Sequence, residues 1–522
     1  AVDYRQAARN NHYPNFQQAM RNNPTRSPYD PDSETGYNVW INESLDYNVV
    51  ADAMLEDYYG LDKWFKPEVN LKLNIKPIPG LNYQQVVGYE NRQWELHQYW
   101  PSTHRSEIDN SRKGHAHLAF SKTENLTSEG YFSYVKDFKG GHNLNATAGY
   151  SYFEVNGENF GMDNYNFSVD GIKYWDIGQG SYLTDGKAGM SSGKSVTERL
   201  FSFFARANYS YQDKYMLSAS IRHEGSSKFA ADNRWANFWS ATAGWRISNE
   251  EFMKDFDWLD DLKIRFGYGV TGNNDFSATY MANMLGSDTN WMMPNGTWAY
   301  SYGKSQNVNP NLGWEEKKEW NLGVDYSFFE GRLYGKFDYY RREVDNLLFS
   351  VKVPQPPYTQ GSQMQNIGSM ESKGWEFEVG GDIIRTKDFT WSSSMNLSHN
   401  TGKILTLEGD NSYHNGNGFV APGTPGDAAR MEAGSTIGSF YMWKFAGFDD
   451  EGSFLLYNKD GEVIPAAQKT ENDKQYIGNY TPKLIIGWSH TLTYKNFDLG
   501  INLRSWIDFD VYNTINMYYG IQ

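Results

Sequence analysis

The chain has 522 residues, of which 39% are hydrophobic and 16% aromatic, and its formal net charge is −15. This negative charge argues against nucleic acid as a partner, and the absence of cysteine excludes disulfides and cysteine-ligated metals. No segment approaches the roughly 18 consecutive apolar residues that a transmembrane helix requires. With a mean hydropathy of −0.71, the chain does not have the composition of a helical membrane protein.

Residues 1–68 are polar and rich in turn-forming residues, as in the run RNNPTRSPYDPDSETG. We interpret them as a large surface loop with a short helix from about Tyr4 to Met20. The first strand pattern begins at Val69, and a second strand follows over residues 81–89 after the proline-rich turn KPIPG. Residues 90–126 contain several histidines and charged residues and are predicted to form a loop, with a β-extension inside it as the alternative.

Apolar and polar residues alternate again in several segments between residues 131 and 268. The predicted strands cover residues 131–138, 144–152, 201–209, 217–221, 239–247 and 262–268. Short turns such as KGGH and YQDKY separate some of them, and a long loop over residues 154–198 separates others. Residues 271–317 are predicted to form a further long loop.

The clearest alternation lies between residues 319 and 398, which are predicted to form two successive hairpins. In EWNLGVDYSFF the apolar residues are Trp320, Leu322, Val324, Tyr326 and Phe328. The apolar residues recur with a period of two, which is typical of a strand, and the pattern covers about ten residues, which is the length that a tilted strand needs to cross a bilayer. Residues 399–481 form the longest connection, in which IGSFYMWKFAGF is predicted to be a strand, and a last hairpin covers residues 484–503.

About fourteen strands joined alternately by short turns and long loops are typical of a transmembrane antiparallel β-barrel, which faces lipid outside and a polar lumen inside. The fold class is therefore all-β. Residues 69–522 are assigned to the barrel and residues 1–68 to an extracellular loop region. Four tryptophans of the apolar strand face are predicted to face lipid or to form an interfacial girdle: Trp320, Trp375, Trp391 and Trp488.

Several short motifs suggest sites that their context does not support. GYGVTG at residues 267–272 matches a dinucleotide-binding pattern, but a loop rather than a helix is expected after it. His115 and His117 could bind a metal from one strand face, but no third ligand is identifiable. NKDGE at residues 458–462 has too few acidic ligands for a calcium loop and is interpreted as a turn. No nucleophile elbow, HExxH or P-loop is present, and no cofactor or metal is expected. Carboxylates such as Asp260–Asp261 and Asp449–Asp450 are plentiful, so a glycosidase pair stays open by counting, although nothing ties any two of them to one cleft.

Four aromatic residues in the loop over residues 271–317 are the candidate substrate-binding residues: Trp291, Trp298, Tyr300 and Tyr302. Aromatic rings of this kind stack on sugar rings or hold a peptide. The alternative is that they pack the loop against its neighbours, and the general tendency of aromatic residues to be buried favours this alternative.

The sequence resembles the SusC/RagA family of TonB-dependent outer-membrane transporters of Bacteroidota-type bacteria. The resemblance spans most of residues 127–510 and rests on stretches such as HNLNATAGYSYF, WSATAGWRISNEEFMKDFDWLDDLKIRFGYGVTGNND, NPNLGWEEKKEWNLGVDYSFFEGRLYGKFDYYRREVDNLL, NIGSMESKGWEFEV and GSFYMWKFAGF. It implies a 22-stranded barrel with an N-terminal plug. With about fourteen strands and no recognisable plug, TonB box, signal peptide or closing aromatic strand, the chain is expected to be the middle and later part of a protein roughly twice as long.

The resemblance implies active import of oligomeric nutrients, glycans or sometimes peptides, across the outer membrane. A SusD-like surface lipoprotein would cover the extracellular mouth, and TonB would pull on the plug; the barrel itself would do no covalent chemistry. Two alternatives stay open. The chain could belong to a passive porin or surface adhesin, or it could be a soluble, aromatic-rich glycan-binding or glycan-cleaving β-protein.

Overall fold

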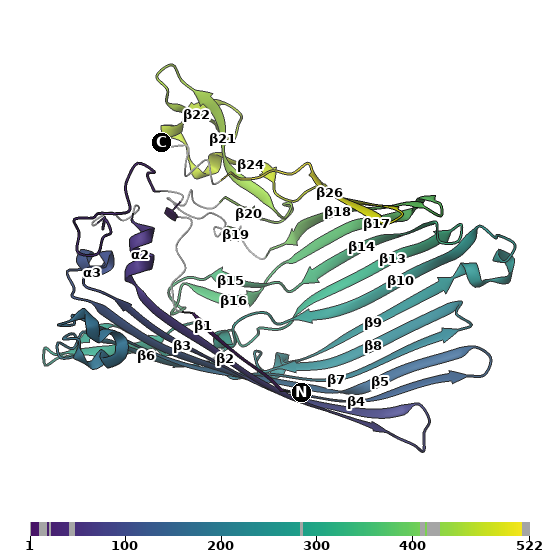
Figure 1. Ribbon diagram of the computed structural model, residues 1–522, viewed down its shortest axis with the longest axis horizontal. Helices are drawn as coiled ribbons and strands as arrows, with labels where there is room; N and C mark the ends of the chain where they lie inside the picture. The colour runs from purple at the N-terminus through teal and green to yellow at the C-terminus, as the bar shows by residue number, and fades with distance from the viewer. Residues whose placement is uncertain are drawn as a thin grey trace.

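The computed structural model describes residues 2–9, 18–19, 22–40, 47–281, 285–407, 413–414 and 428–513. Within these ranges, the side chains of Leu285, residues 287–291, Tyr300, Tyr413 and His414 are not described. The described chain is dominated by a 16-stranded antiparallel sheet that curves, so that its first strands are seen nearly edge-on and the later ones nearly face-on (Figure 1). The predicted all-β class is therefore confirmed.

Neighbours in the main sheet follow one another along the chain, as expected when each connection is a hairpin turn or a loop that returns to the adjacent strand. The strands, in sheet order, are β1 (Val2–Arg9), β2 (Asp57–Asn74), β3 (Leu81–Trp100), β4 (His115–Phe138), β5 (His142–Tyr165), β7 (Glu198–Tyr211), β8 (Tyr215–Ser226), β9 (Trp235–Arg246), β10 (Leu259–Asn273), β13 (Glu315–Phe328), β14 (Leu333–Asp345), β17 (Ser369–Arg385), β18 (Phe389–Thr406), β25 (Leu484–Tyr494) and β26 (Phe497–Ile507), with β6 (Gly189–Lys194) paired to β5.

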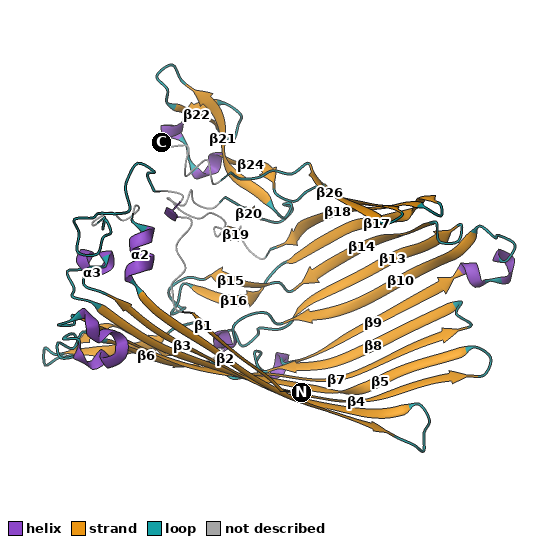
Figure 2. Ribbon diagram, in the orientation of Figure 1, coloured by secondary structure: helices purple, strands orange, loops and turns teal. Residues whose placement is uncertain are grey.

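The two ends of the main sheet differ in the length of their connections (Figure 2). At the turn end, on the right of the figure, most connections are as short as residues 139–141 between β4 and β5. At the loop end, on the left, the connections are long and carry two helices, α2 (Val49–Leu55) and α3 (Arg105–Asp109). The predicted alternation of short turns and long loops is confirmed.

The loops also contain short elements of their own. Additional strands form three two-stranded sheets: β11 (Leu285–Met292) with β12 (Trp298–Lys304), β15 (Leu348–Lys352) with β16 (Ser362–Asn366), and β19 (Tyr413–His414) with β20 (Arg430–Met431). A four-stranded sheet has the order β23 (Val463–Pro465), β22 (Phe454–Tyr457), β21 (Ser439–Phe448) and β24 (Lys474–Asn479). Strand β21 agrees with the strand predicted in IGSFYMWKFAGF. The 3-10 helices are η1 (Asp170–Gln179), η2 (Ala231–Asn233), η3 (Ile247–Asn249), η4 (Glu251–Met253), η5 (Ala278–Met281), η6 (Ala466–Gln468) and η7 (Glu471–Asp473). None of the described helices is long and apolar enough to cross a membrane.

The strands begin earlier and extend further than the sequence pattern indicated. Residues 2–9 form β1 rather than the start of a helix, and β2 begins at Asp57, inside the segment that we assigned to a loop region. Most of residues 90–126, expected to be a loop with a β-extension as the alternative, continue β3 and β4, so the β-extension is what forms. Polar residues occupy both faces of these extensions, so the period-two hydrophobic signal is absent although the backbone pairing continues.

Close approach of strands in the sheet is made possible by glycines that lie opposite aromatic rings. Gly380 is the register partner of Tyr334, and a Cβ atom at Gly380 would lie 2.8 Å from the Tyr334 ring. Gly335 is opposite Tyr326, whose hydroxyl would lie 2.4 Å from a Cβ at that position. The tyrosine rings therefore occupy the space that a side chain on the neighbouring strand would need.

Candidate functional site: the polar face and the loop end

One face of the main sheet carries a row of polar and glycine residues that crosses six neighbouring strands. The register aligns Asn145, Asn208, Ser218, Thr242, Gly267 and Asn321 directly opposite one another. We call this side the polar face and the opposite side the apolar face. These residues line a cavity of about 510 Å³. Amide and hydroxyl groups offer both donors and acceptors, so this wall can bind water, another part of a protein or a polar solute.

An ionic cluster lies on the same face, where β10, β13 and β14 meet. Arg265 makes two hydrogen bonds to Asp325, at 2.9 and 2.8 Å, and contacts both carboxylate oxygens of Asp338, at 3.2 and 3.3 Å. Lys263 also pairs with Asp325, at 2.9 Å. A Cβ atom at Gly323 would lie 2.6 Å from both Arg265 and Asp338, so a larger residue at this position would require these two charged side chains to shift. Charged groups of this kind need water or protein beside them rather than lipid.

The apolar face carries aromatic and aliphatic rows. The rings of Trp239 and Tyr268 are 5.2 Å apart, and those of Trp320 and Tyr339 are 5.5 Å apart. By register, Tyr339 lies opposite Trp375, and Trp488 lies opposite Met395. The structure thus places predicted girdle residues on the apolar face, which is the side that a bilayer could cover.

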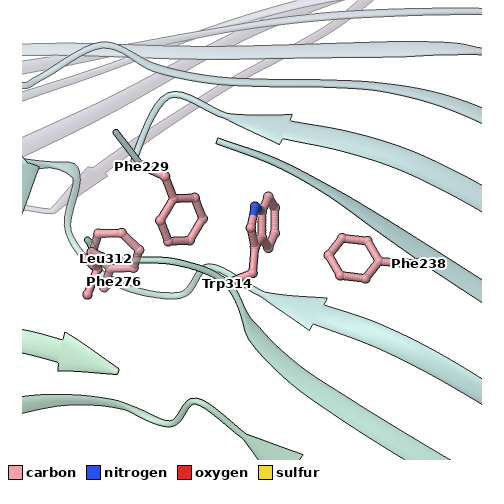
Figure 3. Close-up of a cluster of buried hydrophobic side chains, with 5 residues drawn as sticks. All are labelled: Phe229, Phe238, Phe276, Leu312 and Trp314. Carbon is pink, nitrogen blue, oxygen red and sulfur yellow. The ribbon is translucent and has the colours of Figure 1, made fainter. Parts of the chain in front are cut away.

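At the loop end, a cluster of buried aromatic and aliphatic side chains joins three connections (Figure 3). It consists of Phe229, Phe238, Phe276, Leu312 and Trp314, and we call it the Trp314 cluster. The indole of Trp314 packs against Phe229 and Phe238, with ring centroids 5.0 and 5.2 Å apart, and donates a hydrogen bond to the Arg234 carbonyl at 3.0 Å. Because Phe229, Phe276 and Trp314 come from three different connections, and Phe238 comes from β9, the cluster ties the connections to each other and to the sheet.

Three asparagines extend this support by bonding to backbone groups of neighbouring segments. The Asn307 amide donates to the carbonyls of Gln360 and Ser362 at 2.7 and 2.8 Å and also accepts from the Thr359 N–H at 3.2 Å. Asn309 donates to the Met364 carbonyl at 3.0 Å. Asn366 in β16 both donates to and accepts from Gly313, in NPNLGW. The loop before β13 is therefore held against the β15–β16 hairpin.

The four candidate aromatic residues lie in the hairpin β11–β12, which extends from the same loop. Contrary to the expectation of a loop without strand alternation, Trp298, Tyr300 and Tyr302 alternate along β12, and Trp291 pairs with Ala299. Trp298 and Tyr302 are 67% and 69% exposed, so their rings do not pack the loop in the way that burial tendency suggested. The side chains of Trp291 and Tyr300 lie outside the described residues.

The other sequence motifs have structural roles. Residues 267–272 lie within β10, where no helix begins. NKDGE forms the turn of the hairpin β22–β23, in which the Asn458 side chain accepts from the Glu462 N–H at 2.8 Å. His115 and His117 both contact the same Asp163 oxygen, at 2.9 and 2.8 Å. Asp163 could not be recognised from the residue pattern, because it reaches the pair only through strand register. Among the described residues, no group of three such side chains is arranged to hold a metal ion.

Comparison with known proteins identifies close similarities along nearly the whole chain. Residues 2–513 match the family model described as TonB dependent receptor-like, beta-barrel. The TonB-dependent receptor P3 of Formosa agariphila is 31% identical over 461 residues, which cover 84% of this chain and 44% of the relative. The TonB-dependent receptor SusC of Bacteroides thetaiotaomicron is 34% identical over 340 residues, 63% of this chain and 33% of the relative.

The fold is also similar to a solved structure. A chain of the RagAB peptide importer in its closed-closed state superposes with a TM-score of 0.76 and 23% sequence identity, over 92% of this chain and 52% of the importer chain. Together these matches confirm the resemblance to the SusC/RagA family. The chain spans less than half the length of the curated relatives that it matches.

Proposed function

Because this chain belongs to the TonB-dependent receptor-like β-barrel family, we propose that it forms part of a transporter that imports oligomeric nutrients across the outer membrane. The observation that carries the proposal is the two-faced sheet. Its apolar rows suit lipid, while its polar face, with Arg265, Asp325 and Asp338, suits a water-filled or protein-filled lumen. The plug and the segment that contacts TonB are assigned to the rest of the protein.

The loop end is the proposed extracellular mouth, where a SusD-like lipoprotein would close over the cargo. Two features support this assignment. The Trp314 cluster and Asn307 hold the loops in a fixed arrangement, and the hairpin β11–β12 presents exposed rings from that support. A rigid base with projecting aromatic side chains can bind a glycan or a peptide with little ordering cost. The cargo is therefore proposed to contact Trp298 and Tyr302, together with Trp291 and Tyr300.

The first test is native purification from detergent-solubilised outer membranes, with mass spectrometry of proteins and retained small molecules. We expect a SusD-like lipoprotein and an oligosaccharide or oligopeptide to co-purify with the transporter. Recovery of the barrel protein alone, with neither lipoprotein nor cargo, would contradict the proposal and favour a porin or an adhesin.

The second test addresses the mouth. Replacing both exposed rings, Trp298→Ala with Tyr302→Ala, should raise the concentration needed for half-maximal uptake of the identified cargo roughly tenfold or more, since each stacking ring contributes about 1 kcal/mol. Trp175→Ala is the matched control, because Trp175 is also at the loop end and is 76% exposed. Equal uptake by the double variant, the control and the unmodified transporter would remove these residues from the cargo site.

A further inference from the structure

An exposed aromatic cluster lies on the hairpin formed by β21 and β22, which stands away from the main sheet at the loop end (Figure 1). Its members are Phe445, Phe448 and Phe454, which are 52%, 58% and 60% exposed. The ring centroids are 5.2 Å apart for Phe445 and Phe448 and 5.0 Å apart for Phe448 and Phe454. We call these three residues the Phe448 patch. Contiguous exposed apolar surface of this kind marks an interaction site, whereas single exposed apolar residues do not.

A β-bulge in β21 brings two of the rings together. Residues three apart in a regular strand point to opposite faces of the sheet. Between Phe445 and Gly447, however, β21 gains one residue relative to β22. Gly447 has a φ of +137°, in the region that favours glycine. The extra residue puts Phe445 and Phe448 on one face, and bulges that re-aim side chains in this way are characteristic of functional surfaces.

The turn that joins β21 to β22 is fixed by hydrogen bonds and is acidic. The Asp449 carboxylate accepts from the N–H groups of Glu451 and Ser453, at 3.0 and 2.7 Å. The Phe448 patch is therefore presented in a fixed arrangement, which lowers the entropy cost of binding. Asp450 and Glu451 are exposed, and neither forms an ion pair with a basic side chain among the described residues.

The surroundings of the patch indicate what kind of partner covers it. Phenylalanine rings are buried favourably against another apolar surface, whereas Asp450 and Glu451 are stabilised by basic side chains nearby. A lipid surface does not meet both needs, because the carboxylates would lose water without gaining a partner. A protein surface with an apolar centre and a rim of lysine or arginine meets both. The patch therefore suits a protein partner of this composition.

We propose that the Phe448 patch is the docking surface for the SusD-like lipoprotein at the mouth, which receives the rings in an apolar depression with a basic rim. This rests on the import function proposed above, which puts a lid at the loop end. A lid over the mouth has to contact what projects from that end, and the β21–β22 hairpin projects there (Figure 1). The patch and the aromatic hairpin β11–β12 belong to different segments, so docking of the lid and binding of cargo can be tested separately.

Docking is measured between the whole transporter in detergent and the lipoprotein identified by the native purification, produced without its lipid anchor. Phe448→Ser with Phe454→Ser should raise the dissociation constant roughly tenfold or more, since buried aromatic residues carry much of the binding energy of an interface. Phe252→Ser is the matched control, because Phe252 is 62% exposed at the turn end, in η4, and should leave docking unchanged. Unchanged hydrogen exchange of β21 in the double variant verifies that the hairpin is intact.

Asp450→Lys with Glu451→Lys is the second variant, and it keeps all three rings and Asp449. It tests the same surface by charge, so it remains informative if loss of the rings disturbs the hairpin. Added salt should weaken docking of the unmodified transporter, because it screens the attraction between the acidic turn and a basic rim. The charge variant should dock more weakly at low salt, and its docking should not weaken further as salt is added.

Photo-cross-linking in intact cells identifies what covers the patch. With Phe448 replaced by p-benzoylphenylalanine, the expected product joins the transporter to the lipoprotein. The proposal is overturned if no such product forms, if the product contains lipid or a second copy of the transporter instead, or if both variants dock as tightly as the control. Tight docking by both variants would leave the import function standing, whereas absence of both lipoprotein and cargo from the purified unmodified transporter would overturn the import function as well.

Discussion

Two regions of the loop end are built from opposite kinds of interaction. The Trp314 cluster is held by buried aromatic and aliphatic surface, and its one indole N–H is satisfied by the Arg234 carbonyl. A cavity of about 390 Å³ between α2, α3 and the ends of β3 and β4, which we call the polar cavity, is lined by charged and polar groups. Two buried nitrogens beside it, Nε2 of His104 and Nε of Arg105, have no hydrogen-bond partner among the described residues. The cluster has its polar group paired, whereas the polar cavity leaves two buried donors unpaired at some cost in stability.

The largest effect is expected at the cluster. Trp314→Ala removes an almost fully buried indole and should destabilise the loop end by about 3–5 kcal/mol. Hydrogen exchange of residues 227–234 and 305–314 measures the loss. The control Trp298→Ala removes an exposed indole from β12 and should leave exchange in those segments unchanged. Similar exchange in both variants would show that the cluster does not support the loops.

The polar cavity should respond to acid, whereas the cluster should not. In the folded protein the pKa of His104 is lowered to about 4, whereas an unfolded histidine titrates near 6.5. Between these values the unfolded segment binds more protons, so local stability falls as the pH decreases from about 6.5 to 4 and is constant above that range. The full loss is about 3 kcal/mol. Hydrogen exchange of α3 against pH measures it, and a slope in His104→Asn as steep as in the unmodified protein would contradict this origin.

A smaller effect is expected where hydrogen bonds replace apolar packing. Asn307→Ala leaves the Thr359 N–H and the carbonyls of Gln360 and Ser362 without their hydrogen-bond partner and should cost about 1–3 kcal/mol. Hydrogen exchange of β15 and β16 should increase. Asn295→Ala, in the exposed turn of the β11–β12 hairpin, is the comparison variant and should change exchange in those two strands little. If hydrogen exchange of β15 and β16 increased equally in both variants, Asn307 would not be the residue that holds these strands in place.

The regular part of the sheet could be predicted because each of its strands shows the strand pattern in its own residues. From β13 to β18 and in β25 and β26, one face is apolar and the other polar, so each strand carries its own period-two signal. The extensions of β2, β3 and β4 and the short β1 lack this contrast between faces. Their pairing depends on backbone hydrogen bonds to neighbouring strands, which leave no trace in the residue pattern.

The candidate sites were less predictable for a related reason. The exposed aromatic residues of β12 were recognised by residue type, but their alternation was hidden in a segment that reads as a loop. The polar cavity combines residues 47–56 with residues 98–115, which the pairing of β2, β3 and β4 brings together. His104 itself resembles any other histidine in the sequence. What distinguishes it is a capping bond and a buried nitrogen without a partner.

The pairing of Tyr334 with Gly380 limits the order in which this protein can change during evolution. The three atoms nearest to a methyl group at Gly380 all belong to the Tyr334 side chain, so the obstacle is this side chain on the neighbouring strand. Replacement of the tyrosine by a smaller residue opens that space, and alanine at position 380 then becomes acceptable. The reverse order passes through an overpacked intermediate that costs about 1–3 kcal/mol. Lineages that have lost the glycine are therefore expected to have lost the tyrosine first.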